Sequence, residues 1–157
     1  SIDTGAYIDG FHGDAARTFG VGQISEQRQR LIDITKESFF EGVKLVKVGN
    51  YLNKVSAAIQ DYVESNGYGV VRDYVGHGIG RDMHEDPEIP NYRTGRPGPK
   101  LVKGMTLAIE PMVTVGTYKV HTLPNRWTVV TNDGSDSAHY ENTVLVTENE
   151  PELLTLV

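Results

Sequence analysis

Gly76-His77-Gly78-Ile79-Gly80-Arg81-Asp82-Met83-His84-Glu85 combines three glycines at alternate positions with two histidines. Glycine lets a backbone approach a neighbour closely, or adopt φ values that are closed to other residues. Imidazole is the commonest protein metal ligand and the usual acid–base group near neutral pH. Two interpretations are open for this stretch alone: a tight loop with hydrogen-bonded histidines, or part of a metal or catalytic site.

The composition of the 157-residue chain excludes several classes of protein. Without cysteine, neither a disulfide framework nor a thiolate zinc site can form, so any metal must be held by His and carboxylates. The net charge of −6 argues against binding nucleic acid through its phosphates. No long apolar run or signal peptide is visible, so we expect no membrane span, a cytoplasmic location and a single domain over residues 1–157.

Asp9-Gly10 separates two strand-like runs, residues 2–8 and 11–21, and predicts a hairpin with a two-residue turn. In that register the numbers of paired residues sum to 19, so Asp14 faces Gly5 and Asp3 lies diagonal to Asp14 on the same face. Diagonal neighbours are roughly 7–8 Å apart, close enough for two carboxylates to share ions. The alternative is a solvated pair of acids, and a shift of one residue would separate them.

Helical spacing of apolar residues predicts one helix capped by Ser25 and ended by Gly49, and a second from Leu52 to Ser65. Strands are expected for residues 68–75, 105–115, 118–122, 127–131, 137–147 and 153–157, with a long ordered loop over residues 85–100. This order predicts an α+β fold with a mainly antiparallel sheet.

Glu110 and Glu141 each interrupt an apolar strand. A buried carboxylate needs a partner or a metal, although an edge acid paired with Lys or Arg would also explain each one. With Asp3, Asp14 and His77 they make four carboxylates and one imidazole, which could converge only around cations. Such an oxygen-rich set suits two ions of Mn, Fe(II), Co or Zn.

Four segments, in chain order, resemble type I methionine aminopeptidases of the pita-bread metallopeptidase superfamily, M24. They are Ile2-Asp3 through Asp9-Gly10-Phe11-His12-Gly13-Asp14, Gly76-His77-Gly78-Ile79-Gly80 with His84-Glu85, Ile109-Glu110-Pro111-Met112-Val113, and Ser137-Ala138-His139-Tyr140-Glu141-Asn142-Thr143. The resemblance implies the C-terminal part of the pita-bread (creatinase/aminopeptidase) fold, a curved sheet covered by two helices. It also implies that this chain lacks an N-terminal segment of the family.

The resemblance further implies a role for each ligand. Asp3 would chelate one metal ion, Asp14 and Glu141 would bridge two ions, and His77 and Glu110 would hold the other.

The same resemblance implies the catalytic and substrate-binding residues. Glu110 would also carry protons, and His84 would hydrogen-bond the scissile carbonyl. Met83, where bacterial relatives usually carry Phe, and Trp127 would contact the methionine side chain. His12 and His139 are interpreted as structural.

The expected function is removal of the N-terminal methionine from nascent proteins by a metal-activated hydroxide, favouring a small second residue. Its partners would be N-terminal Met peptides, with the ribosome as a candidate. Two alternatives stay open: a pita-bread peptidase for Xaa-Pro peptides, and a catalytically incomplete fragment that only binds metal or peptide.

Overall fold

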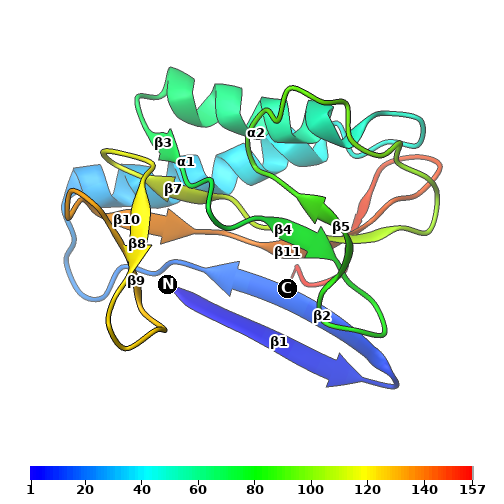
Figure 1. Cartoon of the computed structure of the whole chain (residues 1–157), viewed down its shortest axis with the longest axis horizontal. Coiled ribbons are helices and arrows are strands. Elements are labelled where there is room, and N and C mark those ends of the chain that lie inside the picture. Colours follow the sequence, from blue (N-terminus) through cyan, green and yellow to red (C-terminus); the bar gives the residue numbers. More distant parts are fainter. Residues whose placement is uncertain (157) are drawn as a thin grey trace.

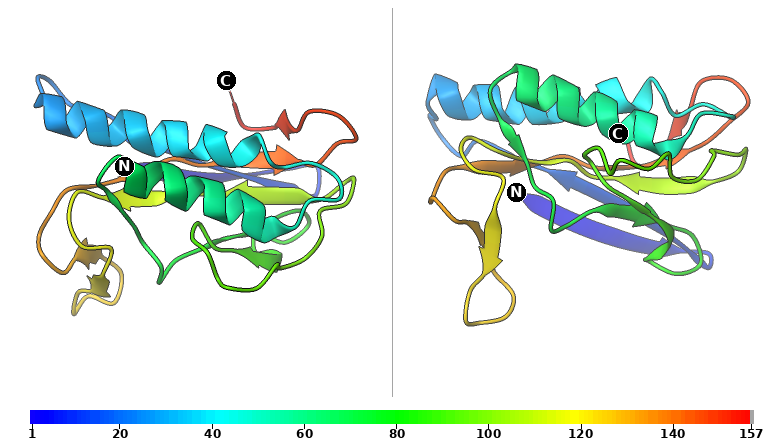
Figure 2. Two further views of the ribbon diagram at one scale, coloured as in Figure 1. Left: turned by 90° about the horizontal axis from the view of Figure 1, so that it is seen from above. Right: turned by 45° about the horizontal axis from the view of Figure 1, so that its top comes forward.

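The computed structural model describes residues 1–156, and its secondary structure forms layers (Figure 1). The helices α1 (Glu26–Val43) and α2 (Leu52–Ser65) lie on one side of the central strands. A hairpin of β1 (Ile2–Ile8) and β2 (Phe11–Arg17) lies on the other side. Seen from above, the two helices run side by side across the strands (Figure 2). Within residues 1–156, no helix is long and apolar enough to cross a membrane.

The remaining strands are short, and every ladder in the described part of the chain is antiparallel. Their bounds are β3 (Gly69–Val70), β4 (Gly76–Gly78), β5 (Glu85–Ile89), β6 (Thr106–Ile109), β7 (Met112–Thr114), β8 (Val120–Thr122), β9 (Val129–Thr131), β10 (Ser137–His139), β11 (Asn142–Leu145) and β12 (Glu152–Leu153). They form a five-stranded sheet β12-β11-β6-β4-β5, a three-stranded sheet β10-β7-β3, and the hairpin β8-β9. The predicted α+β class, with a mainly antiparallel sheet covered by two helices, is confirmed.

Both helices form where the apolar spacing predicts them. Ser25 caps α1, because its hydroxyl accepts a hydrogen bond from the Arg28 backbone N–H at 3.3 Å. The predicted end at Gly49 is wrong: α1 ends at Val43, and the next residues make tighter bonds to the third residue back, such as Val46 N–H to Val43 O at 2.9 Å. The second helix has the predicted bounds.

The apolar faces of the helices pack on the five-stranded sheet and make its core. The fully or almost fully buried side chains of this cluster include Phe39, Val43, Val55, Ile59, Leu107, Ile109, Tyr140 and Val144. The apolar faces of both helices therefore belong to the core.

Several predicted strand bounds are wrong. The predicted strand at residues 105–115 is broken at Glu110-Pro111, and the one at residues 137–147 is broken at Tyr140-Glu141. Proline has no N–H to donate to a ladder, which explains the first break. Residues 85–100 contain β5, because tertiary pairing with β4 overrides their turn-like composition.

Other elements are shorter than predicted. Only β3 forms within residues 68–75, and β2 ends at Arg17 rather than at residue 21. The strands β8 and β9 each start two residues later than predicted. Near the C-terminus only Glu152–Leu153 is a strand, and residue 157 lies outside the described residues.

Close backbone approach, and not a positive φ, explains the glycines of β4. Neither Gly76 nor Gly78 has a left-handed backbone. A Cβ on Gly76 would lie 2.2 Å from Ala108 O of β6, and one on Gly78 would lie 2.2 Å from Asp86 O of β5. These neighbours are backbone atoms that cannot turn aside, so β4, which lies between β6 and β5, requires glycine at these positions.

We expect Gly78→Ala to lower the free energy of unfolding by about 1–3 kcal/mol, since the added methyl must push β5 away. Urea unfolding of the metal-free protein measures this. Gly13→Ala is the matched control, because its Cβ would meet only Thr155 Cγ2 at 3.4 Å. In that strand position alanine should be neutral or stabilise by about 0.5–1 kcal/mol. Equal stability of the two variants would contradict the explanation.

Candidate metal centre and active site

The five predicted ligands come from five places in the chain. Asp14 on β2, His77 on β4 and Glu141 before β11 each offer one ligand atom within 4.8 Å of the others. Glu110 joins them, with its Oε1 3.6 Å from His77 Nε2. The charge of Asp3 raises the pKa of both Asp14 and Glu141, so Asp3 borders the same group.

The hairpin register that places Asp3 and Asp14 is the predicted one: Asp14 pairs with Gly5, and Asp3 pairs with Ala16. The hairpin is tied to the segment that carries Glu141. The Asp14 backbone N–H donates to Thr143 Oγ1 at 2.8 Å, and the Glu141 N–H donates to Ala16 O at 2.9 Å. Thr143 therefore fixes Asp14 beside Glu141. This role of Thr143, the last residue of the motif at residues 140–143, was not predicted from the sequence.

Glu110 and Glu141 lie at neighbouring breaks in two paired strands. Ile109 still pairs with Asn142, and Met112 pairs with His139, but the residues between them leave the ladder. Arg17 donates to the Glu141 backbone carbonyl, which stabilises the second break. The pairing keeps one register on both sides of the breaks, so Glu110 and Glu141 lie opposite each other.

Glu141 is the most strongly perturbed acid of the group. Glu141 is 1% exposed, and neither of its carboxylate oxygens has a hydrogen-bond partner among residues 1–156. Burial, with the charges of Glu110, Asp14 and Asp3, raises its pKa to about 10. Burial, followed by the charge of Asp3, also raises the pKa of Asp14. A buried carboxylate without a donor is costly unless a cation is present.

His77 is prepared to accept a cation. Its Nδ1 lies 2.8 Å from Gly78 O, and a carbonyl oxygen only accepts, so Nδ1 carries the proton. The lone pair on Nε2 then faces Glu110 Oε1 at 3.6 Å and Asp14 Oδ2 at 3.9 Å. A lone pair among carboxylates is repelled unless a cation lies between them. Four carboxylates with one imidazole nitrogen are a donor set that fits divalent metals.

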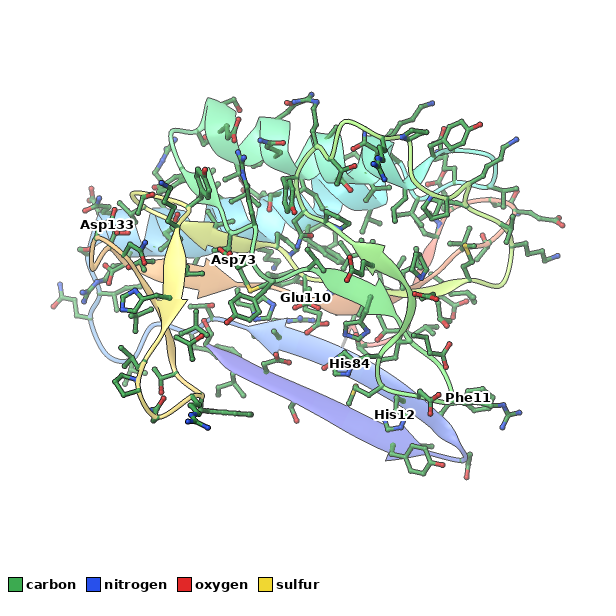
Figure 3. The ribbon with its side chains drawn as sticks, in the orientation of Figure 1. Phe11, His12, Asp73, His84, Glu110 and Asp133 are labelled. Atoms are coloured by element: carbon green, nitrogen blue, oxygen red, sulfur yellow. The ribbon has the colours of Figure 1, made fainter. Side chains whose placement is uncertain are left out.

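A cavity of about 420 Å³ opens beside these residues. Asp3, His77, His84 and Glu110 line its polar part. The His84 ring lies 4.4 Å from the His77 ring, centroid to centroid. Figure 3 shows Glu110 and His84 in the space between the central strands and the β1–β2 hairpin. The rest of the lining is largely apolar and includes Val71, Val75, Met112, Val120, Val129, Val130 and Ala138.

The structure does not bring the other two predicted substrate residues to this cavity. Met83 is half-buried and packs over Gly5 of β1. Its Cε lies 2.2 Å from the position that a Cβ on Gly5 would take. Trp127 lies between β8 and β9 and is 88% exposed. Neither residue is among those that line the cavity. The apolar wall comes instead from valines of the β8–β9 hairpin.

The sequence profile of metallopeptidase family M24 matches residues 1–148. A protein named methionine aminopeptidase from Clostridium acetobutylicum is 66% identical over 158 residues, covering 99% of this chain and 62% of that protein. The crystal structure of methionine aminopeptidase from Thermotoga maritima superposes with a TM-score of 0.95 at 51% identity, covering 99% of this chain and 62% of that one. Prolidase from Pyrococcus furiosus shares the fold with a TM-score of 0.74 at 28% identity, covering 99% of this chain and 40% of that one. The chain spans about 62% of the length of the methionine aminopeptidases named here.

We expect the metal-free protein to lose stability as the pH rises. Native Glu141, with its pKa of about 10, keeps a proton that the unfolded chain releases above 4.5. The unfolded state therefore binds fewer protons, and the free energy of unfolding falls by up to about 1.4 kcal/mol per pH unit between those values. The raised pKa of Asp14 acts in the same direction.

Urea unfolding from about pH 5 to pH 9 measures this slope. Glu141→Gln should flatten the slope and be more stable than the wild type at the alkaline end. Glu148→Gln is the control, since Glu148 is an exposed acid 3.0 Å from Lys103 Nζ and should leave the slope unchanged. Parallel curves for all three proteins would contradict the raised pKa of Glu141.

Proposed function

The chain belongs to metallopeptidase family M24, and from this we propose that it is a metal-dependent aminopeptidase that removes methionine from the N-terminus of peptides. One observation carries the proposal beyond the family. The buried Glu141 carboxylate, without a donor among the described residues, lies with three other acids and the free Nε2 of His77 beside an apolar cavity. This combination suits cations at one end and an apolar side chain at the other.

We propose that the centre holds two divalent cations. Asp3 would chelate one, Asp14 and Glu141 would be shared, and His77 with Glu110 would hold the other. Two ions explain the excess of negative charge better than one, because a single ion cannot contact four carboxylates and an imidazole well. When bound, such ions lower the pKa of water and polarise a peptide carbonyl. All five ligands lie within residues 1–157, which we propose act as one catalytic domain.

The side chains supply the remaining chemistry of amide hydrolysis. Glu110 reaches both the ligand group and the cavity, so we propose that it takes a proton from the attacking water and gives it to the leaving amine. His84 lines the same cavity and would donate a hydrogen bond to the scissile carbonyl oxygen. That bond is worth most when negative charge develops on the oxygen.

The cavity would also select the substrate. Val71, Val120, Val129 and Val130 offer an apolar wall for the methionine side chain. Trp127 would have to contact a substrate from the exposed end of the β8–β9 hairpin, and Met83 would act through its packing on β1. A small second residue is the proposed preference. Nascent proteins in the cytoplasm, at the ribosome, are the proposed source of such peptides.

Mass-spectrometric detection of free methionine from Met-Ala-Ser tests the proposal, with Mn or Co titrated into metal-free protein. Methionine release should rise with added metal. Ala-Pro-Ala is assayed in parallel, since the prolidase from Pyrococcus furiosus shares the fold. Preference for the Pro peptide would replace the proposed substrate with Xaa-Pro peptides. Metal binding without cleavage of either peptide would favour the binding-module alternative.

We expect Glu110→Gln to lower kcat for methionine release by about 10²- to 10⁴-fold at saturating metal, because the amide cannot carry the proton. Steady-state kinetics at several Mn concentrations separate this loss from weaker metal binding. Glu148→Gln serves as the control and should keep kcat, because Glu148 does not line the cavity. Unchanged kcat in Glu110→Gln would remove Glu110 from the proposed mechanism.

A further inference from the structure

A second histidine contacts Glu110 at the carboxylate oxygen that His77 does not contact. His139 is the last residue of β10 and lines the 420 Å³ cavity. Its Nε2 lies 3.5 Å from Glu110 Oε2, while His77 Nε2 lies 3.6 Å from Glu110 Oε1. Each carboxylate oxygen of Glu110, which is labelled in Figure 3, therefore has an imidazole nitrogen within 3.6 Å.

The His139 ring nitrogen needs a partner that the rest of its surroundings do not provide. Its side chain is 13% exposed, and Nε2 is buried with no aligned hydrogen bond in the part of the chain that the structure describes. Against a carboxylate oxygen, a lone pair on Nε2 would be repelled, whereas an N–H would be attracted. Glu110 Oε2 is thus the natural acceptor for an Nε2 proton. Contacts of this kind are often long before substrate and metal bind.

The two histidines differ in what their ring nitrogens contact. Nδ1 of His77 is occupied by Gly78 O, which leaves its Nε2 as a lone pair for a cation. His77 Nε2 lies within 4.0 Å of both Asp14 and Glu110, whereas His139 Nε2 lies within that distance of Glu110 alone among the acids of the described residues. Its position fits a donor to Glu110 and does not fit a further ligand.

The backbone of His139 is fixed on both sides. Its N–H donates to Thr18 Oγ1 at 2.9 Å, and Thr18 Oγ1 donates to its carbonyl at 3.0 Å. In the ladder His139 pairs with Met112, two residues after Glu110. A ring mounted in this way can orient the carboxylate that it faces, as partners of metal ligands generally do.

We propose that His139 is a positioning residue, whose Nε2–H donates a hydrogen bond to Glu110 Oε2 and so turns Oε1 toward His77 and the metal ligands. The inference rests on the proposed role of Glu110 as a ligand and proton carrier. It assigns to His139 a function that its motif position did not indicate.

Two substitutions separate the hydrogen bond from the shape of the ring. His139→Gln keeps an N–H donor, whereas His139→Leu keeps bulk without one. Calorimetric titration of Mn into the metal-free proteins should show binding weakened about 10- to 100-fold by His139→Leu, but within about threefold of wild type for His139→Gln. His121→Leu is the control, because His121 is exposed on β8 and bonded to Asn132 at 2.7 Å.

The same titration in a Glu110→Gln background tests whether His139 acts through Glu110. There, His139→Leu should cost much less Mn affinity, as expected for coupled residues. Urea unfolding confirms that each variant is folded.

Equal losses in the Leu and Gln variants, no loss in either, or an undiminished loss beside Glu110→Gln would each overturn the proposal. So would a wild-type protein that binds no Mn. If the wild type binds Mn but releases no methionine, the proposed function fails, and Mn affinity alone still decides the role of His139.

Discussion

Mutual repulsion among buried carboxylates is the constraint on which the rest of the structure depends. Asp14 and Glu141 are 8% and 1% exposed, yet their pKa values rise because water is excluded and other acids lie beside them. Such a group stays together only if the backbone holds it there. The hydrogen bonds of Thr143 to Asp14 and of Glu141 to Ala16 do this, because they tie the hairpin to the central strands.

The strands that surround the acids depart from regular β structure in two ways. The ladders are interrupted where Glu110 and Glu141 leave them, and β4 carries glycine where β5 and β6 approach most closely. The register is the same on both sides of the interruption, so Glu110 and Glu141 stay opposite each other, and the charge of Glu110 raises the pKa of Glu141. The helices supply the buried apolar area that stabilises this arrangement.

Local signals predicted much of this arrangement. Asp9-Gly10 gave the hairpin register, since turn geometry alone determines it, and apolar spacing gave α2 to the residue. Residues 138–146 contain no proline or glycine to mark the break at Glu141, and β5 forms only by pairing with β4. The contact of His139 with Glu110 depends on how two broken strands meet, which spacing along one chain does not encode. For the same reason, the exposure of Trp127 could not be foreseen.

The proposed metal ligands lie on segments that differ in how firmly they are held. Every residue of β1 is exposed, and β1 is paired along one edge, to β2, in the described structure. Asp14, Glu110 and His77 belong to segments tied into the protein interior, whereas Asp3 belongs to this ribbon. Segments with few buried contacts open at low free energy. A cation that binds Asp3 must therefore also order β1. Cation binding and ordering of the hairpin are then thermodynamically linked.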